Sequence, residues 1–551
     1  MVHSTRVHAP VKGGFARLPI YLACCALVVS GCTAPIVKEG DAPNGPDYVR
    51  WMPKEYKAEV QVRLPRPKEL WWQDFGSTEL NGLVDTALTN NYDLRVAVSR
   101  VAQTRAQADV VKAAESPTLD VVSGYSNQAP YPAIGSAANT SQWRSQGTWQ
   151  AGVLASYEVN LWGKKGFDTQ SAFAQALASE YNREVVALSL VSDVVTVYFQ
   201  VVSLDERIRV GQRNLEAIRG LTRGLSRRVQ LGDATEIDYY QQVILQNTIN
   251  AQVISLQQQR EQAFTRLATL LGRTPSSLTI AAKSIDGIRV PVVEPGLPSD
   301  LLCRRPDIRR AEAMLVAAQA DLYAARANIM PNFVLTGGSG YGSYLLSALT
   351  MPQSLFYNVT SNLVANIFDG GKRDAQVQIS SAKNVEMLET YANTVLTSLR
   401  EVEDSLTGIT LSAKAYDTLS EAREKALRLT VMSQRVVELG GMDFVQLYEI
   451  QRSVFNAEDI AISARYDQLR ASVSLFKSIG GGTKLGADPC LGGGKLPAAD
   501  ARWIQNASNQ DSVFGKKPAV GVNALGQPIL EGTGAPVFAE PAVPSVTNVK
   551  P

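Results

Sequence analysis

The feature that most restricts the fold is a proline-free stretch from Phe167 to Leu231. As a helix, about 65 residues at 1.5 Å each would reach roughly 95 Å, which is too long for a compact domain. Apolar residues such as Leu188, Val191 and Val195 recur at three- to four-residue spacing, and the remaining faces carry Gln, Ser, Asn and Arg. This pattern predicts a long solvated helix that packs through one stripe, as in coiled coils.

The long helical pattern breaks at a glycine in two places, in VQLGDATEIDYYQ and in VELGGMDFVQLYE. Gly232 can adopt the left-handed conformation that ends a helix, and Asp233 or Thr235 can cap the next helix. Gly440 and Asp443 offer the same combination in the second segment. Each break therefore predicts a reversal between two antiparallel helices, and both reversals are expected at the same end of the molecule.

The chain is duplicated. The spacing from Asp93 to Asp307 equals the spacing from Pro117 to Pro331, and 231–272 matches 439–480 without a gap. Such long-range similarity indicates two duplicated halves rather than short solenoid repeats. The expected organisation is a leader (1–31), an N-terminal segment (32–75), a first repeat (76–272), a linker rich in Pro, Gly and Ser (273–304), a second repeat (305–482) and an irregular tail (483–551).

Each repeat is expected to contain two strands between a short helix and a long one. In 149–161 and 357–368 apolar and polar residues alternate, whereas 118–128 and 332–344 alternate weakly and are rich in glycine. One apolar and one polar face fit an outer-membrane barrel, with lipid outside and water inside. A half-exposed sheet of a soluble protein would show the same alternation, so the alternation alone favours neither.

Four strands cannot close a barrel, and an open sheet edge in lipid would leave backbone groups without hydrogen bonds. The smallest bacterial barrels have about eight strands. The strands must therefore come from several chains, and an obligate homo-oligomer follows if the sheet lies in a membrane. A trimer with twelve strands is one solution, but the strand count alone does not select it.

The N-terminus has the pattern of a lipoprotein signal peptide. Lys12 and Arg17 precede an apolar stretch from Leu18 to Val29, and Cys32 follows Ser30-Gly31. The apolar stretch is too short to cross a bilayer. Acylation of Cys32 would anchor the mature chain. By resemblance to other bacterial lipoproteins, Thr33 in place of an aspartate favours the outer membrane. The alternative is an ordinary signal peptide with an incidental cysteine. If the chain is lipid-anchored, the alternating strands are better explained by a membrane barrel than by the sheet of a soluble protein.

Composition excludes several classes of function. The net charge of +2 gives no support for a nucleic-acid partner. Cleavage before Cys32 removes both histidines, so acid–base catalysis by histidine and zinc sites with histidine ligands are excluded. We expect no catalytic residue, cofactor or metal. A disulfide between Cys303 and Cys490 is possible, but two unrelated thiols are the favoured interpretation.

Three segments carry a resemblance to the TolC-like outer-membrane factors, in the NodT- or OprM-type lipoprotein branch. They are LWWQDFGSTELNGLVDTALTNNYDL, GLPSDLLCRRPDIRRAEAMLVAAQADLYAARANIMPNF and LYEIQRSVFNAEDIAISARYDQLRASVSLFKSIGGG. The resemblance covers about 70–482 and implies a mainly α protein with a β-barrel part. The implied assembly is a homotrimer with a twelve-stranded outer-membrane barrel and a periplasmic tunnel of long antiparallel helical hairpins.

The resemblance also implies partners and sites. A periplasmic adaptor and an inner-membrane RND-type pump are expected to dock at the hairpin tips, which comprise Gly232, Asp233, Thr235, Gly440, Gly441, Met442 and Asp443. The tunnel constriction of the family matches Asp238, Gln446 and Glu449, and Gln446 replaces a common acidic residue. Three copies of Glu449 could form an acidic ring. The alternative is that Glu449 lies on a solvated helix face.

The expected function is the passive exit duct of a tripartite efflux pump in the outer membrane. Two alternatives remain open, namely a duct for type I protein secretion and a structural periplasmic lipoprotein without a pore. Arg304 and Arg305 are expected to anchor the linker onto neighbouring helices. Trp71 and Trp72 are expected to pack where the N-terminal segment meets the helices.

Overall fold

The structure is a computed structural model. It describes residues 53, 56–57, 70–128, 146–282, 284–291, 298, 301–438, 441, 444–481, 521–522 and 528–529. The chain divides after Met52, and every described residue belongs to the second unit. Cys32, Gly440, Met442, Asp443 and Cys490 lie outside the described residues, so their expected roles remain predictions.

The first repeat follows the order expected from the sequence, with one additional helix, α3, at its start. A 3-10 turn, η1 (Trp71–Phe75), precedes it, and its elements are α3 (Thr78–Asn90), α4 (Tyr92–Ala113), β1 (Thr118–Gln128), β2 (Gln146–Val159), α5 (Lys164–Gln230) and α6 (Glu236–Leu270). The strand β1 has the expected bounds, whereas β2 begins and ends slightly earlier than 149–161. The linker contains η3 (Pro275–Ser277) and a single helical turn, α7 (Leu301–Arg304).

The second repeat lacks a counterpart of α3 but otherwise has the same order and the same long-helix lengths. It consists of α8 (Pro306–Ala327), β3 (Asn332–Ser343), β4 (Leu355–Val364), α9 (Lys372–Glu438) and α10 (Phe444–Ser478), with η5 (Leu346–Ala348) and η6 (Pro352–Ser354) between the strands. Helices α5 and α9 each have 67 residues, and α6 and α10 each have 35. In the tail, β5 (Gly521–Val522) pairs with β6 (Pro528–Ile529).

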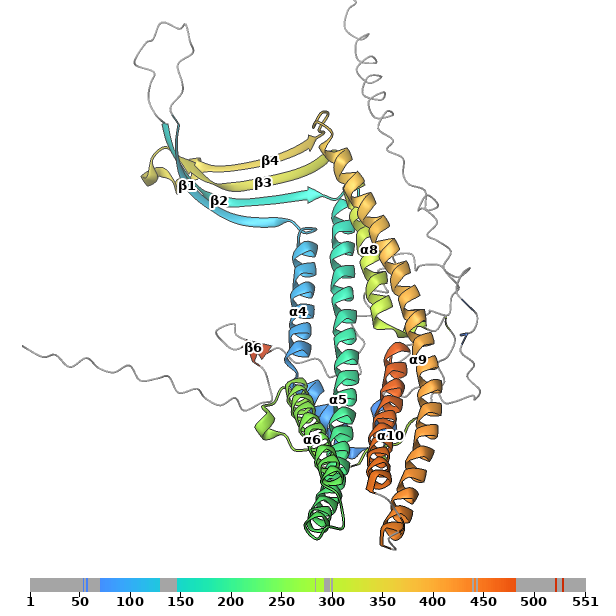
Figure 1. Cartoon of the computed structure of the whole chain (residues 1–551). Coiled ribbons are helices and arrows are strands. Elements are labelled where there is room, and N and C mark those ends of the chain that lie inside the picture. The colour runs from blue at the N-terminus through green and yellow to red at the C-terminus, as the bar shows by residue number, and fades with distance from the viewer. Residues whose placement is uncertain are drawn as a thin grey trace, which may run out of the picture. The chain divides into compact units, whose positions relative to one another are not determined.

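The four strands form one antiparallel sheet in the order β1-β2-β3-β4. The two repeats meet where β2 pairs with β3, with Val153 opposite Ser339. Among the described strands, β1 and β4 each have one edge without a partner. The helices α4, α5, α8 and α9 all meet the sheet at one end, and α5 and α9 run from there to the hairpin tips (Figure 1).

The strand register separates two faces of the sheet. One face, called here the apolar face, carries aliphatic and aromatic side chains with a few Ser and Gly residues. Its members include Val121, Trp149, Val153, Tyr157, Phe333, Leu335, Tyr341, Tyr357, Val359 and Leu363. The other face, called here the polar face, carries Asp120, Gln150, Glu158, Thr336, Asn358, Thr360 and Asn362 together with most of the strand glycines, and it also includes the apolar residues Val122, Leu154, Val334, Phe356 and Val364. The alternation expected from the sequence is confirmed.

Glycines on the polar face let the sheet curve sharply. Gly152 pairs with Gly340, and a Cβ on Gly152 would lie 2.5 Å from the Ser339 carbonyl oxygen. A Cβ on Gly340 would lie 2.5 Å from the Gly152 Cα. Backbone atoms cannot move aside cheaply, so only glycine fits where these two strands approach. The resulting curvature is visible in Figure 1, and curvature of this kind is required to close a barrel.

The apolar stripe of α5 forms the centre of the helical part. Helix α5 packs against α3, α4, α6, α8 and α10, and α9 packs against α8 and α10. Val191, Val195 and Val202 are at most 1% exposed, as their spacing predicts. One window of α5 is apolar enough to cross a bilayer, but 61% of it is buried in the protein. Burial against neighbouring helices accounts for that composition.

Candidate functional site: the hairpin tips and the tunnel helices

The first hairpin tip is built as the sequence predicts. Gly232 has φ +81°, its N–H donates to the Val229 carbonyl, and the Asp233 N–H donates to the Arg228 carbonyl. These two bonds form the Schellman motif, in which a left-handed glycine satisfies the last carbonyls of a helix. Helix α5 therefore ends at a defined reversal, and α6 begins a few residues later.

The second tip repeats this geometry in the part that the structure describes. The Gly441 N–H donates to the Val436 carbonyl at 3.0 Å, which matches the bond between Asp233 and Arg228 in the first tip. The glycine pair that follows α10 again shows the motif, because Gly481 donates to the Phe476 carbonyl and Gly480 has φ +87°. The same local rule thus ends corresponding helices in both repeats.

Asp238 caps the start of α6. The Asp238 N–H donates to Thr235 Oγ1 at 3.2 Å, and the Thr235 N–H and hydroxyl donate to Asp238 Oδ2 at 3.2 and 2.7 Å. This reciprocal arrangement is a capping box. The carboxylate expected at the tunnel constriction is thus engaged in local hydrogen bonds at the tip. Its role in narrowing the tunnel remains a prediction.

The other two constriction candidates lie on the first turns of α10. Gln446 is exposed, and Glu449 is exposed with an ion pair of 2.9 Å to Arg452 Nη2. Both observations agree with a tunnel-lining position and equally with a solvated helix face. The paired arginine is a feature that sequence reasoning missed, and it would partly neutralise an acidic ring.

Polar contacts between the two repeats were also missed. Arg207 on α5 donates through Nε and Nη2 to both carboxylate oxygens of Asp459 on α10, at 2.7 and 2.9 Å. The neighbouring Glu458 side chain is 1% exposed, and its carboxylate accepts from Arg213 Nη2 at 2.5 Å and from Asn214 Nδ2 at 3.1 Å. Two adjacent carboxylates on α10 therefore tie the second hairpin to the first.

An apolar cluster and an amide pair join the same hairpins closer to the tips. Leu215 and Ile218 from α5, Leu245 and Ile249 from α6, and Phe455 from α10 form one buried cluster. On the tip side of it, Gln242 Nε2 donates to Gln451 Oε1 at 3.1 Å. The described parts of the two hairpins are therefore held together by contacts between repeats, and a movement of one hairpin away from the other must break or rearrange these contacts.

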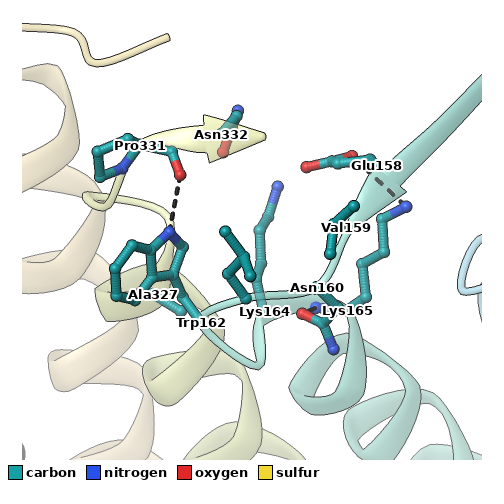
Figure 2. Close-up of a pocket in the computed structure, with 10 residues that line it drawn as sticks. Glu158, Val159, Asn160, Trp162, Lys164, Lys165, Ala327, Pro331 and Asn332 are labelled. Carbon is teal, nitrogen blue, oxygen red and sulfur yellow. Dashed lines mark hydrogen bonds and ion pairs between the residues drawn. The ribbon is translucent and has the colours of Figure 1, made fainter. Parts of the chain in front are cut away.

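The junction between sheet and helices contains a small cavity of about 10 Å³. Its lining includes Glu158, Trp162, Lys164 and Pro331, and the Trp162 indole N–H donates to the Pro331 carbonyl at 2.7 Å (Figure 2). A cavity of this size holds about one water molecule. The described residues also contain no group of three or more His, Cys, Asp and Glu side chains that could hold a metal.

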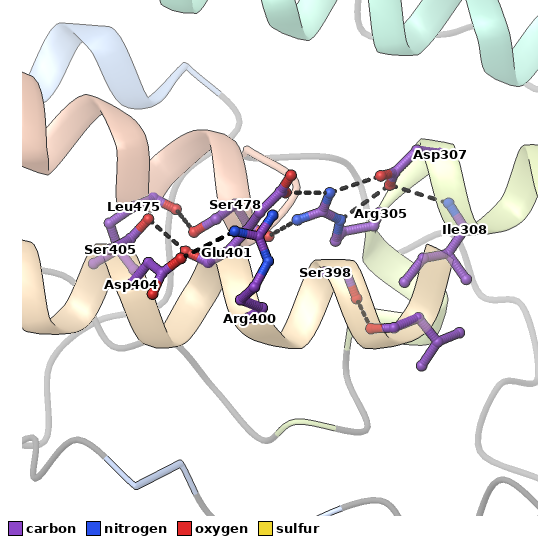
Figure 3. A network of polar contacts seen from close by, with 11 residues as sticks. Arg305, Asp307, Ile308, Ser398, Arg400, Glu401, Asp404, Ser405, Leu475 and Ser478 are labelled. Atoms are coloured by element: carbon purple, nitrogen blue, oxygen red, sulfur yellow. Dashed lines mark hydrogen bonds and ion pairs between the residues drawn. The ribbon is translucent and has the colours of Figure 1, made fainter. Parts of the chain in front are cut away.

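Arg305 anchors the linker, as expected. Its Nε and Nη2 donate to the two carboxylate oxygens of Asp307 at 3.0 and 2.6 Å, Nη2 donates to Glu401 at 2.7 Å, and Nη1 donates to the Ser478 carbonyl at 2.8 Å (Figure 3). Burial alone would lower the pKa of Arg305, but the two carboxylates together raise it above its ordinary value. The guanidinium therefore links the start of α8, the middle of α9 and the end of α10.

The tryptophan pair packs as expected. Trp71 and Trp72 are 1% and 2% exposed, and Trp71 stacks on Phe476 of α10 with ring centroids 4.8 Å apart. One expectation is wrong, because Cys303 is disulfide-bonded in the structure rather than a free thiol. Spacing in the sequence carries no information on such pairing. The four other cysteines lie outside the described residues.

The comparisons with known proteins agree with this architecture. The model of the outer membrane efflux protein family matches residues 83–273 and 297–481, which correspond to the two repeats. The chain therefore belongs to the outer membrane efflux protein family, the TolC-like efflux factors. It is a transport conduit of the outer membrane.

Particular relatives share most of their length with this chain. The pyoverdine export outer membrane protein OpmQ of Pseudomonas aeruginosa is 34% identical over 468 residues, which cover 85% of this chain and 97% of the relative. Outer membrane protein OprJ of the same species is 32% identical over 75% of this chain and 86% of its own. The open-state structure of the Neisseria gonorrhoeae MtrE outer membrane channel is 26% identical, with a TM-score of 0.71 over 78% of this chain and 95% of that one.

Proposed function

We propose that this protein is the passive exit duct of a tripartite efflux pump, acting as a homotrimer anchored in the outer membrane through acylated Cys32. The observation that carries the proposal is the four-stranded sheet with one apolar face and two open edges, placed at the end of two long helical hairpins. Lipid requires all backbone groups to be paired, so β1 and β4 must pair with strands of other copies. Three copies give the twelve strands that the family resemblance implies.

Exposed apolar stripes on the helices support packing between copies. Ile237, Tyr240 and Ile244 on α6 are each more than half exposed in the single chain. On α9, Met432 is 65% exposed and Val436 is 37% exposed. Apolar residues three and four positions apart form a stripe along one face of a helix, and the helices of a tunnel pack together through such stripes. We assign these stripes to contacts with neighbouring copies.

The cargo that we propose is small organic molecules rather than secreted proteins. The names of related outer-membrane proteins specify pyoverdine, solvents, toluene and antibiotics. The polar face of the sheet, with Asn358, Thr360 and Asn362, would line a wet lumen without a specific binding site. The conduit itself supplies no energy, so an inner-membrane pump and a periplasmic adaptor must drive export.

The test is site-specific photocrosslinking in cells that express the pump. A photoreactive residue at Thr235 lies at the first tip, and a matched one at Gln258 lies on the same helix about 35 Å away. Capture of the adaptor of a proton-driven pump from Thr235 alone would support the proposal. An adaptor of an ATP-driven exporter would move the function to protein secretion. No adaptor from the tip, combined with no conductance in a planar bilayer, would leave only a structural lipoprotein.

A further inference from the structure

The lipid-facing surface extends past the strand ends. After β2 ends at Val159, Leu161 and Trp162 are 55% and 48% exposed, and after β4 ends at Val364, Ile367 and Phe368 are 97% and 88% exposed. Trp162 keeps its indole N–H bonded to a carbonyl while its ring stays partly exposed. Rings with one apolar and one polar end are typical of the boundary between membrane and water. This boundary therefore lies at the starts of α5 and α9.

Both long helices begin with a lysine at this boundary. Lys164 is the first residue of α5 and Lys372 is the first residue of α9. The N-terminal end of a helix carries a positive partial charge, so a cation there is unfavourable. The unfavourable choice occurs at the matching position of both repeats. Helix α5 has no acidic residue in its first turn to compensate for it, whereas α9 has Asp374 there.

The neighbouring basic residues have a structural explanation. Lys165 Nζ donates to the Ala114 carbonyl at 2.7 Å, just past the end of α4. Arg373 Nη1 donates to the Ile329 carbonyl at 3.0 Å, just past the end of α8. In each repeat the second basic residue thus fastens the long helix to the end of the short one. No such contact explains the first basic residue.

The side-chain ammonium groups of Lys164 and Lys372 form no hydrogen bond or ion pair within the part of the chain that the structure describes. The Lys164 side chain extends from the start of α5 toward the strand ends, between Trp162 and Glu158 (Figure 2). Glu158 is already paired with Lys165 at 3.6 Å. Asp168 interacts electrostatically with Lys164, but it lies about one turn farther from the sheet.

We propose that Lys164 and Lys372 bind the phosphate groups of phospholipids in the inner leaflet of the outer membrane, with a preference for anionic phospholipids. This inference rests on the proposed function, which places the helices in the periplasm. The helices leave the sheet on the side of these lysines, so lipids of the outer leaflet are out of reach. A basic residue near an anionic membrane surface strengthens binding about five-fold, and a trimer would present both lysines three times.

The test uses purified full-length trimers and three proteins. They are the wild type, the double variant Lys164→Gln with Lys372→Gln, and a control with Lys383→Gln and Lys425→Gln. The control removes the same charge from exposed sites farther along α9. Each protein is exchanged into mixed micelles of detergent and phosphatidylcholine, with or without phosphatidylglycerol, and retained lipid is counted by native mass spectrometry.

We expect wild type and control to retain phosphatidylglycerol over phosphatidylcholine, and the double variant to retain it about five-fold more weakly. In phosphatidylcholine alone the double variant should be at least as heat-stable as wild type, because glutamine relieves the conflict with the helix dipole. Equal retention by all three proteins, or an equal loss in the control, would overturn the inference. If trimers conduct normally in that case, the proposed function stands, whereas absence of conductance in the wild type would refute the proposed function itself.

Discussion

Replacing Arg305 should destabilise the folded trimer more than replacing any exposed arginine. The side chain is 8% exposed and makes four hydrogen bonds to Asp307, Glu401 and the Ser478 carbonyl. Removing one partner of a buried ion pair costs about 3–5 kcal/mol. The Asp307 and Glu401 side chains are 27% and 43% exposed, so water compensates part of the loss. For Arg305→Ala we expect a loss of about 2–4 kcal/mol in the free energy of unfolding.

The lysine variant separates charge from geometry. Arg305→Lys keeps the charge but cannot bind Asp307 through two parallel N–H groups while also reaching Glu401 and Ser478. Its cost should be roughly 1–2 kcal/mol, which lies between wild type and alanine. Arg310 is the matched control, because it is exposed and donates one hydrogen bond to Asn182 at 2.8 Å.

The assay is the half-life of the trimer in detergent at a fixed elevated temperature, because large membrane assemblies unfold irreversibly. A loss of 2 kcal/mol corresponds to about 30-fold in an equilibrium constant, and the half-life of Arg305→Ala should shorten by a comparable factor. Arg310→Ala should change it less than about two-fold. Equal half-lives for Arg305→Ala and Arg310→Ala would refute the assignment of Arg305 as the anchor of the linker.

Four further predictions follow from the sheet, the tips and the helical core. Gly340→Ala should abolish heat-resistant trimers on semi-native gels, because a Cβ there would clash with the backbone of β2. Gly337→Ala should not, because the atom nearest to its Cβ would be 3.9 Å away. Equal trimer yields for the two variants would disprove the steric explanation. Thr235→Ala should cost about 1 kcal/mol locally and speed amide exchange in the first turn of α6 about five-fold, and unchanged exchange would show that the capping box is dispensable. Glu449→Gln should lower the cation preference of the reconstituted channel and Arg452→Gln should raise it, as read from reversal potentials; no shift in either variant would place Glu449 away from the lumen. Burial raises the pKa of Tyr198 to about 12. The contribution of the neutral Tyr198 side chain to the free energy of unfolding is therefore complete below pH 10 and is lost between about pH 10 and 12. Tyr198→Phe should flatten this part of the profile of stability against pH, and an unchanged profile would contradict the raised pKa of Tyr198.

Local signals in the sequence predicted most of the elements. A proline-free stretch, a glycine followed by a capping residue, and strict alternation each have a direct backbone cause, and α5, the first tip and the sheet faces were found in this way. The strand ends were less accurate, because Ala365 to Phe368 continue the alternation of β4 without a strand partner. Alternation reports side-chain direction, whereas a strand ends where its hydrogen bonds end.

The contacts between repeats could not be predicted. In the sequence, Arg207 and Asp459 are charged residues of the kind found on solvent-exposed helix faces, and no neighbouring residue indicates that they pair. Their pairing depends on how α10 lies against α5, which the packing of many apolar side chains decides together. The same applies to the disulfide at Cys303, since its formation depends on distance in space and not on spacing along the chain.

The equal helix lengths in the two repeats, 67 residues for α5 and α9 and 35 for α6 and α10, restrict how this chain can change in evolution. One inserted residue lengthens a helix by 1.5 Å and turns everything beyond it by about 100°. An insertion in α5 alone would move one tip out of level with the other and rotate its packing stripe out of the bundle. The distance from the sheet to the hairpin tips can therefore change only through matched insertions or deletions in both arms of both hairpins, so that the duplication that built the molecule also fixes its length.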